Sequence, residues 1–179
     1  GAIDIKMFDS MHAIRDFRKK KFNIFLSSIF FSYRRFEDVV EAATILKKNG
    51  RDNFKIQING ITSRDYNYYL SIKNLITRRG LDDCIFITPG LSEKQLLDAY
   101  LNADIFIFPN HNQTWGLAVF EAMLAGCVTI VSKTSGASEI LTNEENAFLV
   151  EPKSPDQIAQ ILIRLFENPP LLKKVSENA

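Results

Sequence analysis

The sequence predicts an α/β fold: a Rossmann-like open parallel sheet with helices on both faces. Short β-rich runs alternate with helical ones along the 179 residues, which implies parallel strands joined by helical crossovers. The strands are continuous apolar runs, as expected where a sheet is buried on both faces. The composition, with 46% hydrophobic and 24% charged residues, is that of a globular domain able to bury its own core.

The first half of the chain carries three strand signals, each followed by a helix signal. The predicted strands are residues 23–31, 54–59 and 84–88. The predicted helices are residues 35–49, residues 65–79 and a segment from 92 to 102. Apolar side chains recur three and four positions apart in the first two helices, and Gly50 and Gly80 end them. Ser92 and Gln95 have the spacing of a capping box, which predicts the start of the third.

The second half repeats this alternation. Its predicted strands are residues 104–108, 127–131 and 147–150. Its predicted helices are residues 115–125, a short helix at 137–141, and residues 156–167. Pro109 ends the first of these strands, Ser154 caps the last helix, and Pro169 with Pro170 breaks it.

The domain boundary is placed near the start of the first strand. Residues 1–22 are expected to form a lead-in from a missing amino-terminal domain, and residues 23–179 the Rossmann-like domain. The formal net charge of +1 gives no broad attraction to nucleic acid. The basic residues between 15 and 21 are interpreted either as a solvated helix end or as a peripheral contact with an anionic membrane surface.

Cysteine and histidine positions indicate neither a disulfide nor a metal site. Cys84 and Cys127 are far apart and flanked by apolar residues, which is typical of reduced core cysteines in an intracellular protein. No Cys/His cluster has zinc spacing, so no metal is expected. No apolar run reaches the ~18 residues of a membrane span, and no signal peptide is recognised. The predicted location is the cytoplasm, including the inner face of the membrane.

Ligands of open α/β sheets bind at the carboxyl ends of the strands, near the point where the strand order reverses. The loops that reach this edge follow Phe31, Gly60 and Pro89, together with residues 109–115 and 132–139. Arg34 comes after the first strand, where its guanidinium could bind a diphosphate or remain solvated beside Arg35.

Glu121 is the only carboxylate in the apolar stretch 115–131. Its spacing from Leu117 and Leu124 places it on a face with core-type residues. A buried carboxylate without a partner is costly, so it is normally paired or turned toward a ligand. Two interpretations remain: an internal helix cap or ion pair, and a carboxylate that accepts two hydroxyl groups, as from a ribose.

Small residues at two helix starts would let a ligand approach the backbone. Trp115 and Gly116 open a helix whose first N–H groups attract anions, although one such glycine is a weak signal. Ser135 and Gly136 open the short helix after the next strand. Glu139 in this helix is either an exposed acid or a second carboxylate that faces the ligand.

Taken together, these segments resemble the retaining GT-B glycosyltransferases of family four. The family's signature is a glutamate, a Gly-Phe-Gly-Leu-like turn and a second glutamate eight positions after the first. Ala-Met-Ala-x-Gly, Gly-Gly-x-x-Glu and Asn-Gly-x-Leu-Val segments follow. The matching residues in this chain are 113–123, 125–126, 135–140 and 146–150, and Ala2-Ile3-Asp4 with Phe8 is similar to the family's entry to its carboxyl-terminal domain. The resemblance implies one half of a GT-B fold.

The resemblance also implies roles for individual residues. Glu121 matches the glutamate that binds the donor ribose, and Arg34 stands where the family has the lysine that neutralises the leaving diphosphate. The turn that meets the donor phosphates matches Gly116, Leu117 and Ala118. The loop beside the donor sugar matches Ser135, Gly136 and Glu139. Gly60 and Pro89, at the same edge, are expected to line the donor site.

Three departures from the family pattern affect donor binding. Gln113 replaces the first glutamate, which contacts the donor sugar, and so keeps hydrogen bonding without charge. Ile29 stands where the family has a phosphate-binding arginine. Ser135 replaces the first glycine of its pair. Arg34 and Gln113 are therefore the residues expected to act at the reacting groups.

The predicted function is donor binding for a retaining glycosyltransferase that moves a sugar from a nucleoside-diphosphate sugar to an acceptor, in glycan or cell-surface polysaccharide synthesis. No cofactor or metal is expected, and the isolated domain should be inactive because the acceptor site lies on the missing domain. The alternative is a non-catalytic nucleotide-binding or regulatory module with the same sheet. A dehydrogenase is disfavoured because no G-x-G-x-x-G follows the first strand and Asn59-Gly60 replaces an acidic ribose ligand.

Overall fold

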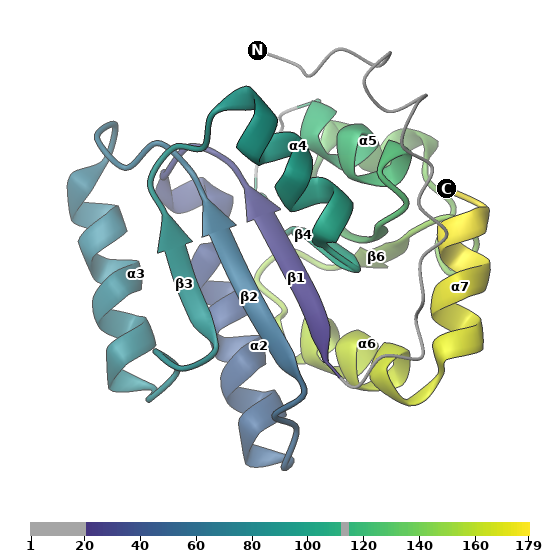
Figure 1. Cartoon of the computed structure of the whole chain (residues 1–179), viewed down its shortest axis with the longest axis horizontal. Helices are drawn as coiled ribbons and strands as arrows, with labels where there is room; N and C mark the ends of the chain where they lie inside the picture. The colour runs from purple at the N-terminus through teal and green to yellow at the C-terminus, as the bar shows by residue number, and fades with distance from the viewer. Residues whose placement is uncertain (1–20, 112–114) are drawn as a thin grey trace.

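The computed structural model describes residues 21–111 and 115–179, and within them six strands form one parallel sheet (Figure 1). The order across the sheet is β3-β2-β1-β4-β5-β6. The strands are β1 (Phe22–Ser27), β2 (Phe54–Asn59), β3 (Ile85–Thr88), β4 (Ile105–Phe108), β5 (Val128–Ser132) and β6 (Phe148–Val150). The predicted open Rossmann-like sheet is confirmed, and its order reverses between β1 and β4.

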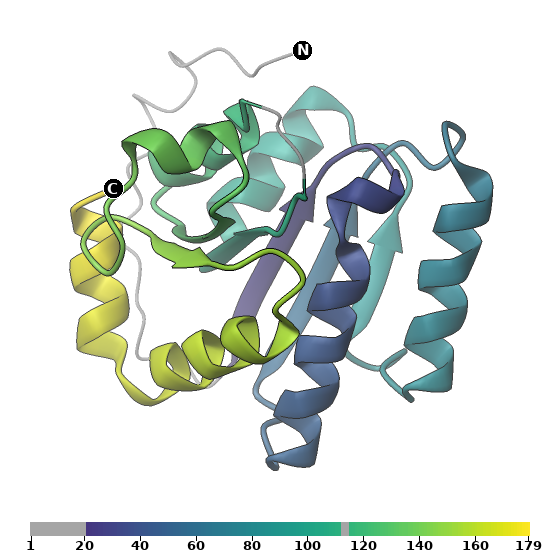
Figure 2. The same cartoon turned by 180° about the vertical axis from the view of Figure 1, so that it is seen from behind.

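Helices pack on both faces of the sheet, as predicted. One face carries α2 (Phe36–Lys48), α3 (Tyr66–Arg78), α6 (Pro155–Glu167) and α7 (Pro169–Glu177). The other carries α4 (Glu93–Asn102), α5 (Leu117–Leu124) and the short 3-10 helix η2 (Gly136–Ile140). A second 3-10 helix, η1 (Ser32–Arg34), precedes α2. Helix α4 lies in front of the sheet in Figure 1, and Figure 2 brings α2 to the front.

Alternate side chains of β1 separate two hydrophobic cores. Ile24 and Leu26 belong to the core beneath α2, whereas Phe25 belongs to the core beneath α4. There the Phe25 ring lies 5.2 Å from the ring of Tyr100 and 6.0 Å from that of Phe106. Burial on both faces explains why this strand is a continuous apolar run.

On the face that carries α4 and α5, the helices do not cover β2 and β3. On β2, Lys55 is exposed and Gln57 is half-buried, and on β3 Phe86 is 46% exposed. Their neighbours Ile56 and Ile58 point the other way, into the core beneath α2. The expectation of two buried faces therefore holds for β1, β4 and β5 and is wrong for β2 and β3. The polar residues that alternate with apolar ones in β2 are the pattern of a strand covered on one face.

The first predicted strand, residues 23–31, is too long, because β1 ends at Ser27. The chain then turns against Gly60, where a Cβ atom would lie 1.9 Å from the carbonyl oxygen of Ser28. Phe30 beyond the turn is fully buried, with its ring 4.8 Å from that of Phe36. The apolar run thus continues as a buried loop, and hydrophobicity alone does not distinguish such a loop from a strand.

The last helices also differ from the prediction. Pro169 and Pro170 end α6, as expected, but they also begin α7, which was not predicted. Proline is well suited to a first helical turn, whose N–H groups need no intrahelical partner. Asn168 caps α7 through a 3.1 Å hydrogen bond from the Leu171 N–H. Ser154 stands at the start of α6, as predicted, but its side chain makes no capping bond.

Two smaller predictions are confirmed. Ser92 and Gln95 form the capping box of α4. Cys84 and Cys127 are both buried core residues.

Replacing Gly60 by alanine should lower the free energy of unfolding by at least about 1–3 kcal/mol, because the new methyl group would overlap the Ser28 carbonyl and force the backbone apart. Gly80→Ala is the matched control. Gly80 has nothing within 4 Å, so its substitution adds only the strain of a φ of +65°, about 1–2 kcal/mol. Urea denaturation of both variants checks this, and a Gly60→Ala variant as stable as the wild type would contradict the close approach.

Candidate functional site

The loops after β1, β4 and β5 are hydrogen-bonded to one another at the carboxyl edge of the sheet. The backbone N–H of His111, after β4, donates to the Tyr33 carbonyl in η1 at 2.7 Å. The Thr134 hydroxyl, after β5, donates to the Asn110 carbonyl at 2.9 Å. The edge predicted to bind a ligand is therefore one connected surface.

The loops after β2 and β3 join the same edge. The Leu91 N–H donates to the Asn59 side-chain oxygen at 3.1 Å, and the Gly60 N–H donates to the Thr88 carbonyl at 3.2 Å. Pro89 is exposed here, as a residue that lines a site would be. Gly60 is buried, and the packing against Ser28 described above is sufficient reason for a glycine at this position.

Arg34 is the last residue of η1 and is only 9% exposed. Its guanidinium carbon lies 4.9 Å from the centre of the Tyr33 ring. Burial lowers the pKa of Arg34, and the neighbouring Tyr33 acts in the opposite sense. An arginine nevertheless stays charged at neutral pH, so this edge carries a desolvated positive charge beside the loop after β4.

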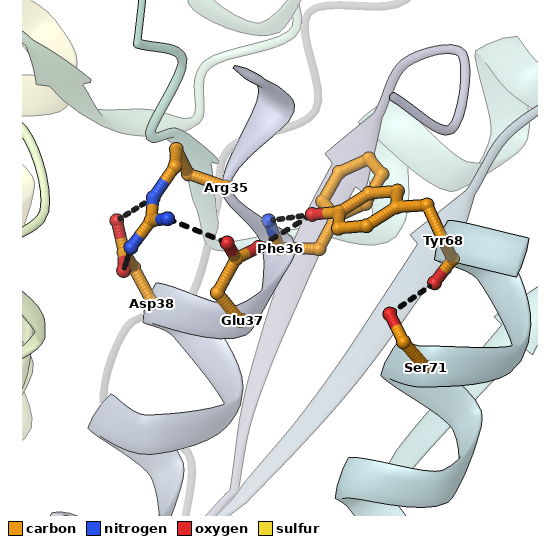
Figure 3. Close-up of polar contacts among 6 residues, drawn as sticks. All are labelled: Arg35, Phe36, Glu37, Asp38, Tyr68 and Ser71. Atoms are coloured by element: carbon orange, nitrogen blue, oxygen red, sulfur yellow. Dashed lines mark hydrogen bonds and ion pairs between the residues drawn. The ribbon is translucent and has the colours of Figure 1, made fainter. Parts of the chain in front are cut away.

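The next residue, Arg35, has a different environment (Figure 3). Its backbone is left-handed, with φ 55° and ψ 40°, which costs a residue other than glycine about 1–2 kcal/mol. Its guanidinium binds Asp38 at 2.6 and 3.1 Å and Glu37 at 2.6 Å. Partial burial acts to lower the pKa of Arg35, but the bond to Asp38 and the charge of Glu37 raise it overall. The charge of Arg35 is thus compensated within the protein, and its role is local structure.

Tyr68 of α3 fixes the same turn from the other side (Figure 3). Its hydroxyl accepts a 2.9 Å hydrogen bond from the Phe36 N–H and donates a 2.5 Å bond to Glu37. Burial, and then the charge of Glu37, raise the pKa of Tyr68, so the phenol stays protonated and continues to donate. The start of α2, directly after Arg34, is therefore held by side chains from two helices.

Gly116 begins α5 in a left-handed conformation, with φ 73°. A Cβ atom there would lie 3.2 Å from the Phe108 ring and 3.3 Å from Ala137. Glycine is therefore required both by the backbone conformation and by the close packing of η2 against the start of α5. This packing brings the two predicted ligand-binding segments together.

The second of these segments shows three different environments. Ser135 is 2% exposed, and its hydroxyl donates to the Ser132 carbonyl at 2.9 Å. Gly136, the first residue of η2, is half-buried, and Glu139 is exposed on the same short helix. The Ser135 side chain thus stabilises the turn, while Gly136 and Glu139 remain closer to the surface.

The spacing of Glu121 predicted that it lies on the core face of α5, and this prediction is wrong. Leu117 and Leu124 are 60% and 43% exposed, and the buried face of the helix carries Val119 and Ala122. Glu121 is half-buried, and its carboxylate accepts a 2.9 Å hydrogen bond from the Tyr100 hydroxyl of α4. The expectation that this carboxylate has a polar partner is therefore met, by a neutral phenol.

Two residues at the start of α5 are accessible to solvent. Trp115 is 73% exposed, and Ala118 is half-buried one turn later. Gln113 lies outside the described residues, so its predicted role stays a prediction. Sequence reasoning missed Tyr100 and used Asn59 only to disfavour a dehydrogenase. A tyrosine within an apolar helix pattern, and an asparagine at a strand end, were the available signals.

The geometry favours binding of an anionic, hydroxyl-bearing ligand: a buried arginine, a helix start at Gly116 and a carboxylate share one edge. Within the described residues no group of three metal-ligating side chains is found. The same part of the chain contains no helix that is both long and apolar enough to span a membrane.

Comparison with known proteins places this geometry in context. The model of the family described as "Glycosyl transferases group 1" matches residues 7–179. A D-inositol 3-phosphate glycosyltransferase of Streptomyces bingchenggensis is 29% identical over 108 residues, which are 60% of this chain and 24% of that protein. The chain thus spans only about a quarter of the length of this curated relative.

Solved structures share the fold. The carboxyl-terminal domain of the group 1 glycosyl transferase LpcC from Francisella tularensis has a TM-score of 0.78 at 28% identity, covering 88% of this chain and 81% of that one. Anabaena Alr3699/HepE in complex with UDP and glucose has a TM-score of 0.81 at 18% identity, covering 89% of this chain and 42% of that one.

Arg35→Gly should unfold at higher urea concentration than Arg35→Ala, with a difference of about 1 kcal/mol in the free energy of unfolding. Both variants lose the ion pairs with Glu37 and Asp38, but glycine adopts the φ of 55° without strain. Both should be less stable than the wild type, because the buried Asp38 carboxylate loses its partner. An alanine variant as stable as the glycine variant would show that residue 35 is not left-handed.

Proposed function

Because the chain belongs to the glycosyl transferases of group 1, we propose that it is the donor-binding, carboxyl-terminal half of a retaining GT-B glycosyltransferase. Its ligand would be a nucleoside-diphosphate sugar. The observation that carries the proposal is the position of Arg34, Gly116 and Glu121 on one connected edge of the sheet. The acceptor site would lie on a second domain, consistent with the small share of its relative that this chain spans.

The first task of the site is to bind the diphosphate. Transfer of the sugar breaks its bond to phosphate and leaves negative charge on the departing diphosphate, and preorganised cations and N–H donors stabilise that charge. Arg34 would supply the cation, because its side chain is only 9% exposed and an arginine stays charged at neutral pH. The backbone at Gly116, Leu117 and Ala118 would supply N–H donors at the start of α5.

The second task is to bind the rest of the donor. Glu121 would accept hydrogen bonds from ribose hydroxyls, with the Tyr100 hydroxyl on one of its oxygens. Gly136 and Glu139, near the surface of η2, would face the sugar, with Gln113 in the role of the family's first glutamate. Pro89 would line the far end of the same edge. UDP in the Anabaena HepE complex supports a nucleotide as the ligand class.

No metal is part of this proposal, because the chain has no Asp-x-Asp motif and the charge is assigned to Arg34 and backbone donors. The proposed setting is glycan or cell-surface polysaccharide synthesis in the cytoplasm or at the inner face of the membrane, where the basic residues between 15 and 21 would meet anionic lipid.

A regulatory nucleotide-binding module is the second candidate. It is favoured by Gln113 and Ile29, which replace a charged sugar ligand and a phosphate-binding arginine of the family pattern. Such a module would bind nucleotide without supporting transfer in the full-length protein. A transfer assay on the full-length protein distinguishes the two candidates.

Titration calorimetry of the chain with UDP, GDP and ADP tests the proposed function. At least one of them should bind with a dissociation constant below the millimolar range, as expected for several charge-assisted hydrogen bonds. The nucleoside without phosphates should bind more weakly, because it makes no contact with Arg34. Absence of binding by all three at millimolar concentration would overturn the proposal.

Arg34→Ala should weaken binding of that nucleoside diphosphate and leave the affinity for the bare nucleoside unchanged, because the guanidinium matches phosphate oxygens. In the full-length enzyme it should lower turnover by roughly a hundredfold or more, the effect of removing one preorganised electrostatic donor. Arg35→Gly is the comparison variant and should change the nucleotide affinity much less. If Arg35→Gly abolishes diphosphate binding and Arg34→Ala does not, the assignment of the cation is off by one residue.

A further inference from the structure

A chain of hydrogen bonds runs along the carboxyl edge of the sheet and ends at Glu121. It begins at the Leu91 N–H, which donates to the Asn59 side-chain oxygen at 3.1 Å. The Asn59 amide nitrogen then donates to the Ser27 hydroxyl oxygen at 3.0 Å. The Ser27 side chain is hydrogen-bonded to Tyr100, and the Tyr100 hydroxyl lies 2.9 Å from the Glu121 carboxylate. This series of hydrogen bonds thus connects β2, β1, α4 and α5.

The directions of the hydrogen bonds in this series are determined by its two ends, a backbone N–H that can only donate and a carboxylate that only accepts. A backbone N–H can only donate, so the atom of Asn59 that meets Leu91 must be its oxygen, and its amide nitrogen must face Ser27. At the other end the Tyr100 hydroxyl donates its hydrogen to the Glu121 carboxylate, so the phenol oxygen can only accept from the Ser27 hydroxyl. The Ser27 oxygen accepts from Asn59. Such a head-to-tail arrangement strengthens each bond in it.

Tyr100 has little freedom to move. It is 1% exposed, and its ring meets Phe25 edge-on at 5.2 Å and Phe106 at 5.6 Å. Burial and the negative charge of Glu121 raise the pKa of Tyr100, so its hydroxyl keeps its proton across the physiological range. The packed ring therefore presents a permanent donor at a fixed point beside α5.

We propose that Tyr100 is a positioning residue that orients the Glu121 carboxylate for the ribose hydroxyls of the donor, with Asn59 and Ser27 orienting Tyr100 in turn. This inference rests on the proposed function, because it gives Glu121 the ribose. Glu121 is half-buried on α5, and its carboxylate accepts the Tyr100 hydrogen bond at 2.9 Å. A hydrogen bond to a charged acceptor fixes both the position and the plane of the carboxylate.

The test compares binding of a ribonucleotide with that of its deoxy counterpart. The probe is whichever of UDP, GDP and ADP binds most tightly, together with its 2′-deoxy form. The wild-type chain should prefer the ribonucleotide. Tyr100→Phe keeps the ring and removes only the hydroxyl, and it should reduce the ratio of the two affinities by about threefold to tenfold, the effect of one misplaced hydrogen bond. The deoxy form should bind the variant nearly as well as it binds the wild type.

Tyr68→Phe is the matched control. Tyr68 is a half-buried phenol that also donates to a glutamate on a neighbouring helix, but its partner is Glu37 rather than Glu121. This substitution should lower the unfolding midpoint without changing the ratio of ribonucleotide to deoxynucleotide affinity. Ser27→Ala provides a second variant, which leaves both Tyr100 and Glu121 in place. It should reduce the ratio in the same direction by a smaller factor.

The outcomes separate this inference from the proposed function. If the wild type binds none of the three nucleotides, the proposed function itself fails. If it binds one and Tyr100→Phe retains the full preference for ribose, Tyr100 does not position Glu121 and the inference is overturned. A wild type that binds ribonucleotide and deoxynucleotide equally overturns it as well, while nucleotide binding stands. An equal loss of preference in Tyr68→Phe would show a general loosening of the domain instead.

Discussion

The pairing of β1 with β4 is the constraint on which the rest of the structure depends. These strands are far apart in sequence, and they are parallel neighbours at Ile24–Ile105 and Phe25–Phe106. Asn23 and Asp104 lock the start of the pair through two 2.8 Å hydrogen bonds, one of them to the buried Asp104 carboxylate. Since the chain leaves β1 toward β2 and leaves β4 toward β5, the strand order reverses here, and the candidate site lies at the carboxyl ends of these two strands.

Two neighbouring arginines at this edge differ in their surroundings. Arg34 and Arg35 are chemically identical, yet one lies over the Tyr33 ring and the other is bound to Glu37 and Asp38. The left-handed backbone of Arg35 costs about 1–2 kcal/mol. Leaving the buried Asp38 carboxylate without a partner would cost more, about 3–5 kcal/mol, so the ion pair outweighs the strain. The ion pairs thus stabilise the left-handed turn at Arg35.

The polar groups of the edge are ordered by the same rule that keeps buried polar atoms hydrogen-bonded. Asn59 and Ser27 lie on neighbouring strands and Tyr100 on α4, and each provides the partner that the next one needs. Their combined effect is a defined orientation for Glu121. A glycosyl donor, rich in hydroxyl groups, is the kind of ligand for which such orientation matters, because a carboxylate recognises hydroxyls through geometry as much as through charge.

The sequence by itself determined the class of fold, the order of strands and helices apart from η1 and α7, and the segments that reach the ligand-binding edge. The spacing of apolar residues and the residues that begin or end an element are local properties of the sequence. They located β2 at residues 54–59 from its apolar pattern, and α4 from its capping box. Local signals also identified Arg34, Gly116 and Glu121 as candidates, since an arginine, a glycine or a lone carboxylate beside an apolar run is visible without coordinates.

Only the tertiary structure decided what those residues contact. The end of β1 depends on the approach of Gly60 to Ser28, and the partner of Glu121 is a tyrosine 21 residues earlier in the chain. The exposed faces of β2 and β3 depend on how far α4 extends across the sheet. Each of these features results from packing between distant segments, and a pattern of neighbouring residues carries no information about the distance between two segments in space. For that reason the sequence located the edge, and the fold determined its contacts.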